Sequence, residues 1–242
     1  MTLLLTGVTG TLGSDLKKLF PEAISPSHSK FDICDKPKVD EFFKNNQIDL
    51  VIHTAALTTV RGCEEDKILA TKINVEGTKN LVDGLFHSNP DGYFVYISTA
   101  CVFDGDSGMY NETSIPSPKN FYSSTKLLGE YELKKLKRSL VIRTNFTGRK
   151  KWPYPKAFTD RFGTYLFSDQ VAKGIKEVID DNLDGIVHIV GEKRISMFEL
   201  AKYTTNDIEP MTVDEYSGPD LTIDMSLDTK RWKKYNILQN EI

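Results

Sequence analysis

The chain has 242 residues, of which 39% are hydrophobic and 27% are charged, and it carries a formal net charge of −3. This length suits one large α/β domain with a small appendage, and the slightly acidic balance argues against a nucleic-acid-binding protein. The cysteines at positions 34, 63 and 101 form neither a CxxC pair nor a cluster with histidines, so we expect no metal site and a reducing compartment. The apolar N-terminus is too short for a signal peptide or a membrane span, so we expect a cytoplasmic protein that does not bind membranes.

Short apolar runs alternate with helical patterns along most of the chain, and this alternation is typical of β-α-β units around a parallel sheet. In chain order, the sequence predicts a strand at residues 2–5, a helix at 12–20, a strand at 23–25, a helix at 36–45, a strand at 50–54 and a helix at 68–88. It then predicts a strand at 93–98, a helix at 121–136, a strand at 140–143, a helix at 168–180, a strand at 185–190 and a helix at 196–203. The pattern weakens after residue 145, where a basic, aromatic and proline-rich stretch at 149–155 predicts a loop.

A glycine-rich turn joins the first predicted strand to the first predicted helix. Gly7 permits a tight turn, Gly10 lets the backbone approach a pyrophosphate, and Gly13 lets the helix pack close to the strand. Phosphates would then lie at the helix N-terminus, where free N–H groups and the helix dipole favour anions. A purely structural turn would have a similar sequence, but this strand–turn–helix context favours a dinucleotide site. The other cofactor contacts expected in the turn are Thr9, Thr11 and Leu12.

The β-α-β pattern and the glycine turn together predict an α/β fold of the Rossmann type, a doubly wound parallel sheet with a small C-terminal substrate-binding lobe. We expect residues 1–145 and 166–190 to form the NAD(P)-binding domain. Residues 146–165 and 191–242 would form the small lobe, because the helix and strand patterns there are short and irregular.

The segment after the predicted strand at 23–25 decides between NAD and NADP in such folds. An acidic side chain there binds the ribose hydroxyls, whereas a basic one accepts the 2′-phosphate of NADP. Ser27, His28 and Lys30 occupy this segment, and no acid precedes Asp32. We therefore expect NADP(H) as the preferred cofactor and leave NAD(H) open, since an ordinary polar loop would have a similar composition.

Tyr122 and Lys126 are four residues apart in a predicted helix, so they share one of its faces. A tyrosine with its ordinary pKa of roughly 10 is a poor acid at neutral pH, and a neighbouring ammonium lowers that pKa by stabilising the phenolate. Thr99 follows the predicted strand at 93–98, and its hydroxyl can hydrogen-bond a carbonyl that is being reduced. Thr99, Tyr122 and Lys126 are the candidate catalytic residues, with Ser98 as the alternative hydroxyl, and the resemblance given in the next paragraph implies the same three. Tyr122 and Lys126 would also contact the cofactor.

Several further motifs occur in a fixed order: residues 98–105 read STACVFDG, residues 118–130 read PKNFYSSTKLLGE, residues 141–144 read VIRT and residues 226–230 read SLDTK. They are similar to the STDYVFDG, PxNxYGxSKxxGE, VIRT and SLDTSK segments of the dTDP-4-dehydrorhamnose reductases, which are extended short-chain dehydrogenases/reductases. The resemblance runs from residue 2 to residue 230. It implies a Ser/Thr–Tyr–Lys triad, an NAD(P)(H) cofactor and a nucleotide-sugar substrate. It also implies that the protein acts in a pathway like dTDP-rhamnose biosynthesis.

The resemblance also implies cofactor contacts outside the glycine turn. His53 at the end of a predicted strand could be a catalytic base, but a histidine beside small residues is more often a structural group, and we favour that interpretation. The implied contacts are Asp32 and Ile33 beside the adenine ring, Thr54, Ala55 and Ala56 after the strand at 50–54, and Asn74 in an NVxGT-like segment, where the family's asparagine is structural or close to the active site.

Five positions depart from the reductase motifs. Ala100 and Cys101 replace an Asp-Tyr pair, Ser123 replaces a glycine, Arg61 replaces an aspartate, and Phe146 stands where the reductases usually carry a tryptophan. In the family these positions face the sugar or its nucleotide, so the departures leave the sugar and the base open.

We expect an NAD(P)H-dependent reductase of a nucleotide-linked 4-keto sugar. A nucleotide-sugar epimerase on the same fold is one alternative, and a non-catalytic NADP-binding regulatory subunit, like that of methionine adenosyltransferase, is another. A dehydratase is disfavoured, because Ala100 and Cys101 supply no carboxylate after the Ser-Thr pair. The oligomeric state stays open, with a homodimer as one option.

Overall fold

The computed structural model of the chain describes residues 1–238. Its centre is a fully parallel sheet with the strand order β1-β2-β3-β4-β9. The strands are β1 (Leu3–Thr6), β2 (Leu50–His53), β3 (Tyr93–Ile97), β4 (Ser139–Thr144) and β9 (Gly185–Ile189). The first four strands are buried along nearly their whole length, as expected for a parallel sheet that is covered on both faces. The predicted α/β fold with a parallel central sheet is confirmed.

The sheet is doubly wound, because the chain leaves β1 toward one edge and then returns to the other side of β1. Ile24 forms a single parallel bridge with Leu4, whereas β2 pairs with the opposite side of β1. In place of the predicted strand at 23–25, the structure thus has this single bridge. Pro26 follows directly and cannot donate a backbone hydrogen bond that would lengthen the pairing. This reversal creates a crevice at the carboxyl ends of β1 and β2, where open α/β sheets bind their ligands.

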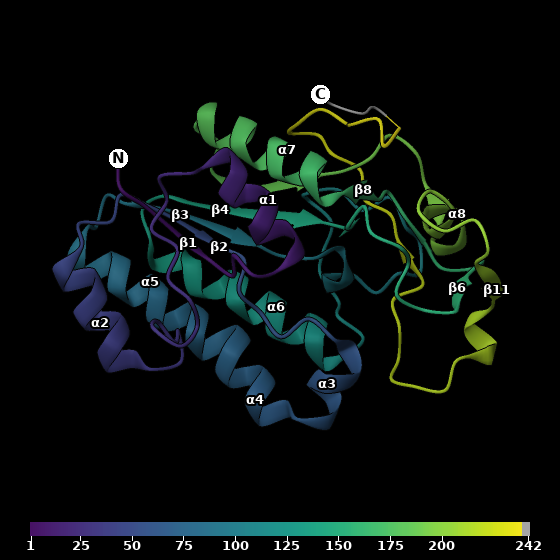
Figure 1. Ribbon diagram of the computed structural model, residues 1–242, viewed down its shortest axis with the longest axis horizontal. Coiled ribbons are helices and arrows are strands. Elements are labelled where there is room, and N and C mark those ends of the chain that lie inside the picture. Colours follow the sequence, from purple (N-terminus) through teal and green to yellow (C-terminus); the bar gives the residue numbers. More distant parts are fainter. Residues whose placement is uncertain (239–242) are drawn as a thin grey trace.

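Helices cover both faces of the sheet (Figure 1). They are α1 (Thr11–Leu19) and α7 (Ser168–Asp180) on one face, and α2 (Lys36–Asn45), α5 (Gly77–Ser88) and α6 (Phe121–Glu132) on the other. Successive strand residues point to opposite faces, so Leu5 and Ile52 belong to the core under α1 and α7, while Leu4 and Val51 belong to the core against α2 and α5.

The predicted helix at 68–88 is interrupted. It consists of α4 (Lys67–Thr71), a π-helical turn (Lys72–Glu76) and α5, and it is preceded by the short helix α3 (Val60–Glu65). The predicted helix at 121–136 ends as α6 at Glu132 and continues as a 3₁₀ turn over Leu133–Lys135. π-helical turns often mark functional sites, and this one lies against α6.

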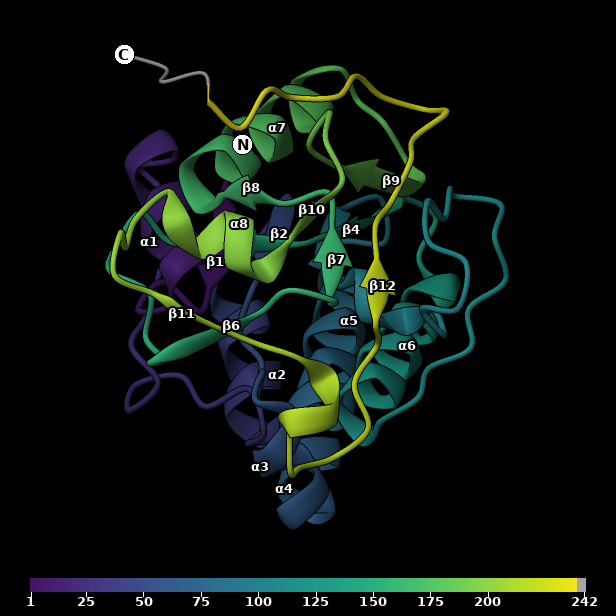
Figure 2. The same cartoon turned by 90° about the vertical axis from the view of Figure 1, so that its right-hand side faces the viewer.

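Short strands, one α-helix and a 3₁₀ turn over Val213–Glu215 form the part of the molecule that faces the viewer in Figure 2. The strands and the α-helix are β5 (Phe146–Thr147), β6 (Lys156–Phe158), β7 (Phe162–Gly163), β8 (Leu166–Phe167), β10 (Ile195–Ser196), α8 (Met197–Lys202), β11 (Glu209–Met211) and β12 (Asp224–Met225). The strand orders β10-β7-β12, β11-β6 and β5-β8 bring segments far apart in the sequence together. The division into a dinucleotide domain and a small lobe stays a prediction, and residues 239–242 of that lobe lie outside the described residues.

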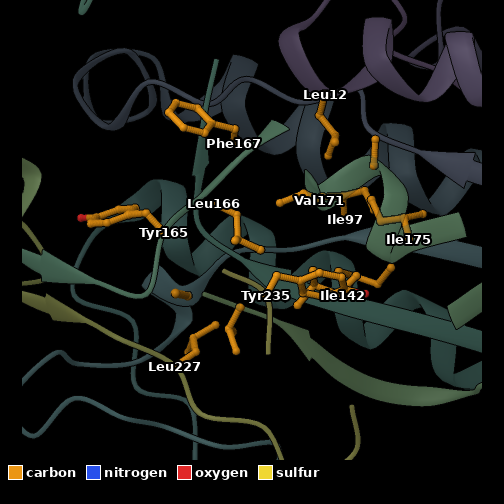
Figure 3. Close-up of a cluster of buried hydrophobic side chains, with 14 of the residues drawn as sticks. Leu12, Ile97, Ile142, Tyr165, Leu166, Phe167, Val171, Ile175, Leu227 and Tyr235 are labelled. Carbon is orange, nitrogen blue, oxygen red and sulfur yellow. The ribbon is translucent and has the colours of Figure 1, made fainter. Parts of the chain in front are cut away.

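One hydrophobic core connects the sheet to these short strands (Figure 3). Ile142 of β4 and Val171 of α7 belong to the same buried cluster as Tyr165, Leu166 and Leu227. The segments after β4 are thus held against the sheet by shared apolar burial. Within residues 1–238, no helix has the length and apolar character needed to cross a membrane.

Candidate active site

A cavity of about 530 Å³ lies at the carboxyl ends of β1, β2 and β3. Its wall consists of residues 6–13, 26–28, 31–34, 54–56 and 97–98, together with Thr58, Ile73, Tyr122, Lys126 and Phe146. This is the crevice that the reversal of the chain creates, and it collects most of the predicted cofactor contacts.

The glycine turn is shaped for close backbone approach. Gly7 has a φ of +76°, and a Cβ there would lie 2.5 Å from Thr54 Oγ1 and 2.6 Å from the backbone nitrogen of Ala55. A Cβ on Gly13 would lie 2.1 Å from the carbonyl oxygen of Gly7. Gly10 is the N-cap of α1 and supplies no capping side chain, and residues 10–13 at this helix end line the cavity. These features fit the pyrophosphate of a dinucleotide.

The segment expected beside the adenosine lines the cavity in part. Ser27, His28, Asp32 and Ile33 belong to the wall, whereas Lys30 does not. Asp32 Oδ1 accepts a hydrogen bond of 2.9 Å from the backbone nitrogen of Cys34 and lies 3.9 Å from Nδ1 of His28. The carboxylate is thus held by its own loop, next to the exposed imidazole.

Thr54, Ala55 and Ala56, which are predicted to contact the cofactor, line the cavity after β2. The preceding His53 is only 1% exposed, and its ring nitrogens lie 2.7 Å from Thr6 Oγ1 and 3.1 Å from Thr78 Oγ1. Burial lowers the pKa of His53 to about 3, and the nearby Lys126 charge adds to that effect. A neutral, doubly hydrogen-bonded imidazole fits the structural interpretation.

Asn74 lies in the π-helical turn and does not line the cavity. Its Oδ1 accepts a 2.8 Å hydrogen bond from the backbone nitrogen of Leu57, and its Nδ2 donates to the Leu57 carbonyl and to Thr125 Oγ1, each at 2.9 Å. Asn74 therefore ties the segment after β2 to α6.

The predicted catalytic pair lies at the start of α6. Asn120 caps the helix by accepting a 2.9 Å hydrogen bond from the backbone nitrogen of Ser123, which fixes the first turn. Tyr122 and Lys126 both line the cavity. Burial raises the pKa of Tyr122, and a hydrogen bond with Thr99 lowers it in part. Burial lowers the pKa of Lys126 to about 7, against the effect of Glu130.

The two candidate hydroxyls have different partners. Thr99 Oγ1 accepts a 3.1 Å hydrogen bond from the backbone nitrogen of Cys101, and the Thr99 side chain is also hydrogen-bonded to Tyr122. Ser98 instead donates its hydroxyl hydrogen to Glu130 Oε1 over 2.5 Å. Ser98 lines the cavity and Thr99 does not, but the Ser98 hydroxyl hydrogen is taken up by Glu130, so Thr99 as the donor to a substrate stays a prediction.

Sequence reasoning missed Glu130 and Arg143. Both are buried, and Arg143 donates Nε to Glu130 Oε1 at 3.0 Å and an Nη to Oε2 at 2.6 Å. The available signal was an arginine inside the apolar VIRT strand, because a buried guanidinium needs an anionic partner.

The departures from the reductase motifs have different surroundings. Phe146 lines the cavity, and Cys101 is buried with its sulfur 3.2 Å from Met225 Sδ. Ser123 donates to Asn120 Oδ1 at 2.8 Å, and Arg61 donates to the carbonyl of Ser217 at 2.9 Å. Neither Ser123 nor Arg61 lines the cavity. Among residues 1–238, no group of three or more metal-binding side chains comes together.

A family model described as the RmlD substrate binding domain matches residues 1–151. The dTDP-4-dehydrorhamnose reductase of Aggregatibacter actinomycetemcomitans is 28% identical, over 82% of this chain and 76% of its own length. Methionine adenosyltransferase 2 subunit beta of Xenopus laevis is 26% identical, over 98% of this chain and 83% of its own length.

Solved structures of dTDP-4-dehydrorhamnose reductases are also similar to this chain. The crystal structure of a hypothetical dTDP-4-dehydrorhamnose reductase from Sulfolobus tokodaii is 34% identical, with a TM-score of 0.85 over 96% of this chain and 93% of that one. The dTDP-4-dehydrorhamnose reductase of Bacillus anthracis in complex with NADP shares the fold, with 23% identity and a TM-score of 0.85 over 94% of this chain and 91% of that one. Because the family model covers more than half of the sequence, the chain belongs to the RmlD substrate binding domain family, within the extended short-chain dehydrogenases/reductases.

Proposed function

We propose that the chain is an NAD(P)H-dependent reductase of a nucleotide-linked 4-keto sugar, with an activity like that of the dTDP-4-dehydrorhamnose reductases. The observation that carries this proposal is that the glycine turn, Tyr122 and Lys126 line a single cavity, with Thr99 beside Tyr122. The family and the reductase relatives support the same activity.

The residues of the chain suit reduction of a ketone. The bound cofactor would supply a hydride to the carbonyl carbon. Tyr122 donates its phenolic proton to the carbonyl oxygen, so the ketone gains one hydride and one proton and becomes a secondary alcohol. Lys126, one helical turn away, stabilises the phenolate that Tyr122 leaves behind. Thr99, which is hydrogen-bonded to Tyr122 in this structure, would turn its hydroxyl hydrogen to the same carbonyl oxygen and hold it near Tyr122.

NADP(H) is the cofactor that we propose, with NAD(H) as the second choice. Ser27 and His28 lie in the cavity wall, where they can hydrogen-bond a 2′-phosphate. The Bacillus anthracis reductase in complex with NADP supports this choice. Asp32 also lines the cavity, but its carboxylate already accepts from the backbone of Cys34.

The substrate is proposed as a class and not as one sugar. Ala100, Cys101 and Phe146 replace larger or more polar residues of the reductase motifs, and Phe146 lines the cavity. Of these changes, the one at Phe146 alters the cavity wall, while Thr99, Tyr122 and Lys126 keep the groups that the reduction needs.

Two alternatives are less well supported. An epimerase would use the same three residues but would keep its cofactor through turnover, without net oxidation of added NADPH. A regulatory subunit, suggested by the likeness to methionine adenosyltransferase 2 subunit beta, has no need of the complete Thr99–Tyr122–Lys126 arrangement. The reductase relatives favour catalysis.

One experiment tests the proposal. The purified chain is given a panel of nucleotide-linked 4-keto sugars with NADPH or NADH, and oxidation of the cofactor is followed by absorbance, with Tyr122→Phe as the matched control. Oxidation that depends on both the sugar and Tyr122 supports the reductase. Cofactor binding without turnover on any sugar would contradict it and favour the regulatory subunit.

A cytoplasmic location and a homodimer are further proposals. The location is supported by three cysteines that form no disulfide in the described chain. Sedimentation of the purified protein tests the dimer.

A further inference from the structure

A buried ion pair lies directly behind the catalytic helix. Glu130 is on α6, one turn beyond Lys126, and is 6% exposed, while Arg143 on β4 is 2% exposed. Arg143 binds the carboxylate through two hydrogen bonds, of 3.0 and 2.6 Å. A buried arginine–carboxylate pair with this two-point geometry holds both side chains in one orientation.

Glu130 also holds the segment directly after β3 that carries Thr99. The Ser98 hydroxyl donates to Glu130 Oε1 at 2.5 Å, and the Ser98 backbone nitrogen donates to the carbonyl of Ile142 at 2.7 Å. Ser98 is therefore fixed to α6 on one side and to β4 on the other. Because Thr99 is the next residue, its position relative to Tyr122 depends on these contacts.

Glu130 also affects the protonation of Lys126. The titratable and charged groups around Lys126 are Tyr122 and Glu130 on α6, Tyr96 on β3, His53 on β2, and Arg143 behind Glu130 on β4. His53 and Tyr96 are neutral at pH 7, because burial lowers the pKa of His53 to about 3 and raises that of Tyr96. The carboxylate of Glu130 is the anionic member of this group, and it favours the protonated form of Lys126.

We propose that Glu130 is a positioning residue for the reduction: it fixes the Ser98–Thr99 segment, directly after β3, against α6. The inference rests on the proposed reductase function for its effect on turnover. Its effect on Lys126 can be measured through cofactor binding alone, without any sugar.

Four variants separate positioning from a purely structural ion pair. Glu130→Gln removes the charge but keeps an acceptor for Ser98, and it leaves Arg143 as an unpaired buried cation that can prevent folding. Glu130→Gln combined with Arg143→Met removes both charges and avoids that problem. Ser98→Ala keeps the ion pair and removes only the hydroxyl contact. Glu132→Gln is the matched control, because Glu132 lies on the same helix and pairs with Lys135 at 3.7 Å, away from the cavity.

The first measurement is the affinity for NADPH over a range of pH by titration calorimetry. In the wild type, binding should weaken as Lys126 loses its proton. In Glu130→Gln the midpoint of that loss should move to lower pH by about one unit, and in the double variant it should move by less, because the Arg143 cation is removed together with the carboxylate. Glu132→Gln should keep the wild-type midpoint. The second measurement is steady-state reduction of the active sugar, where Ser98→Ala should lower kcat about tenfold with little change in KM, because a displaced Thr99 misplaces the carbonyl.

Two results together would overturn the proposal and show an ordinary structural ion pair. They are a folded Glu130→Gln or double variant whose NADPH binding weakens at the wild-type pH, and a Ser98→Ala protein with the wild-type kcat. If neither charge variant folds, the kcat of Ser98→Ala decides it. If the wild type reduces no nucleotide sugar, the proposed reductase function fails. The pH at which NADPH affinity falls in each variant then still shows whether Glu130 affects the protonation of Lys126.

Discussion

The ammonium of Lys126 lies 4.1 Å from the centre of the Tyr96 ring. An aromatic face attracts a cation, so Tyr96 partly replaces the water that Lys126 loses at 4% exposure. The replacement is incomplete, because burial still lowers the pKa of Lys126 to about 7. Lys126 therefore changes its charge close to neutral pH.

We expect the affinity for NADPH to fall as pH rises through about 7, because the neutral amine is a weaker partner for an anionic cofactor than the ammonium. Lys126→Met should remove this pH dependence and weaken binding at lower pH by about tenfold, the value of one hydrogen bond to a charged group. Titration calorimetry at a series of pH values measures both effects. A wild-type affinity that stays constant across this range would contradict the assignment.

The same pKa shift predicts how stability responds to pH. In the unfolded chain the lysine keeps its proton up to about 10.5, whereas in the folded chain it loses the proton near 7. The unfolded state therefore binds more protons between these values, so the Lys126 contribution to the free energy of unfolding rises with pH in this window. Urea unfolding at a series of pH values should show a steeper rise of the free energy of unfolding with pH in the wild type than in Lys126→Met. Equal rises would argue against a lowered pKa of Lys126.

Tyr122→Phe removes one hydroxyl and leaves the ring in place. A positioned acid contributes roughly 10²–10⁴-fold to rate, so turnover should fall by about that much while NADPH binding stays near the wild-type value. Thr99→Val should give an intermediate rate, since it removes only one hydrogen bond to the carbonyl. Steady-state kinetics and calorimetry on the three proteins check this order, and a Tyr122→Phe enzyme with wild-type turnover would refute the mechanism.

The sequence predicted the strands of the sheet well, because a parallel strand that is buried on both faces appears as a short, continuous apolar run. It did not predict the π-helical turn at 72–76. The amphipathic pattern of residues 68–88 is continuous, and the interruption accompanies contacts of Asn74 with Leu57, 17 residues earlier, and with Thr125 on α6. Contacts between segments so far apart leave no local signal.

The glycine turn and the Tyr122–Lys126 pair could be recognised because their spacing is local. The partners of Ser98 could not, since Glu130 and Arg143 meet only when α6 packs against the sheet. The three polar residues of the predicted phosphate segment could not be ranked either. Only the path of the loop places His28 in the cavity wall and leaves Lys30 outside it.

Two glycines of the turn should respond differently to substitution. At Gly10 a Cβ would lie 3.3 Å from the carbonyl oxygen of Gly7, and its φ of −77° suits any residue. Gly10→Val should therefore fold but lose most of its affinity for NADPH, because the side chain occupies the approach to the pyrophosphate. At Gly13 a Cβ would lie 2.1 Å from the same oxygen, so Gly13→Ala should destabilise the fold by about 1–3 kcal/mol.

Thermal unfolding with and without NADPH distinguishes the two effects. Gly10→Val should keep the melting temperature of the free protein and lose the shift caused by the cofactor. Gly13→Ala should melt earlier in both conditions. A Gly10→Val protein with an undiminished NADPH shift would place the pyrophosphate elsewhere.

The last prediction concerns the choice of cofactor. His28 lines the cavity with its side chain 85% exposed, while Lys30 lies outside the wall, so the imidazole and the hydroxyl of Ser27 are the groups available to a 2′-phosphate. We expect NADPH to bind more tightly than NADH. His28→Ala should reduce the affinity for NADPH several-fold and leave that for NADH unchanged, because NADH lacks the phosphate. Lys30→Ala should have the smaller effect on NADPH. Calorimetry with both cofactors on the three proteins tests this, and equal binding of NADPH and NADH by the wild type would contradict a phosphate site at His28.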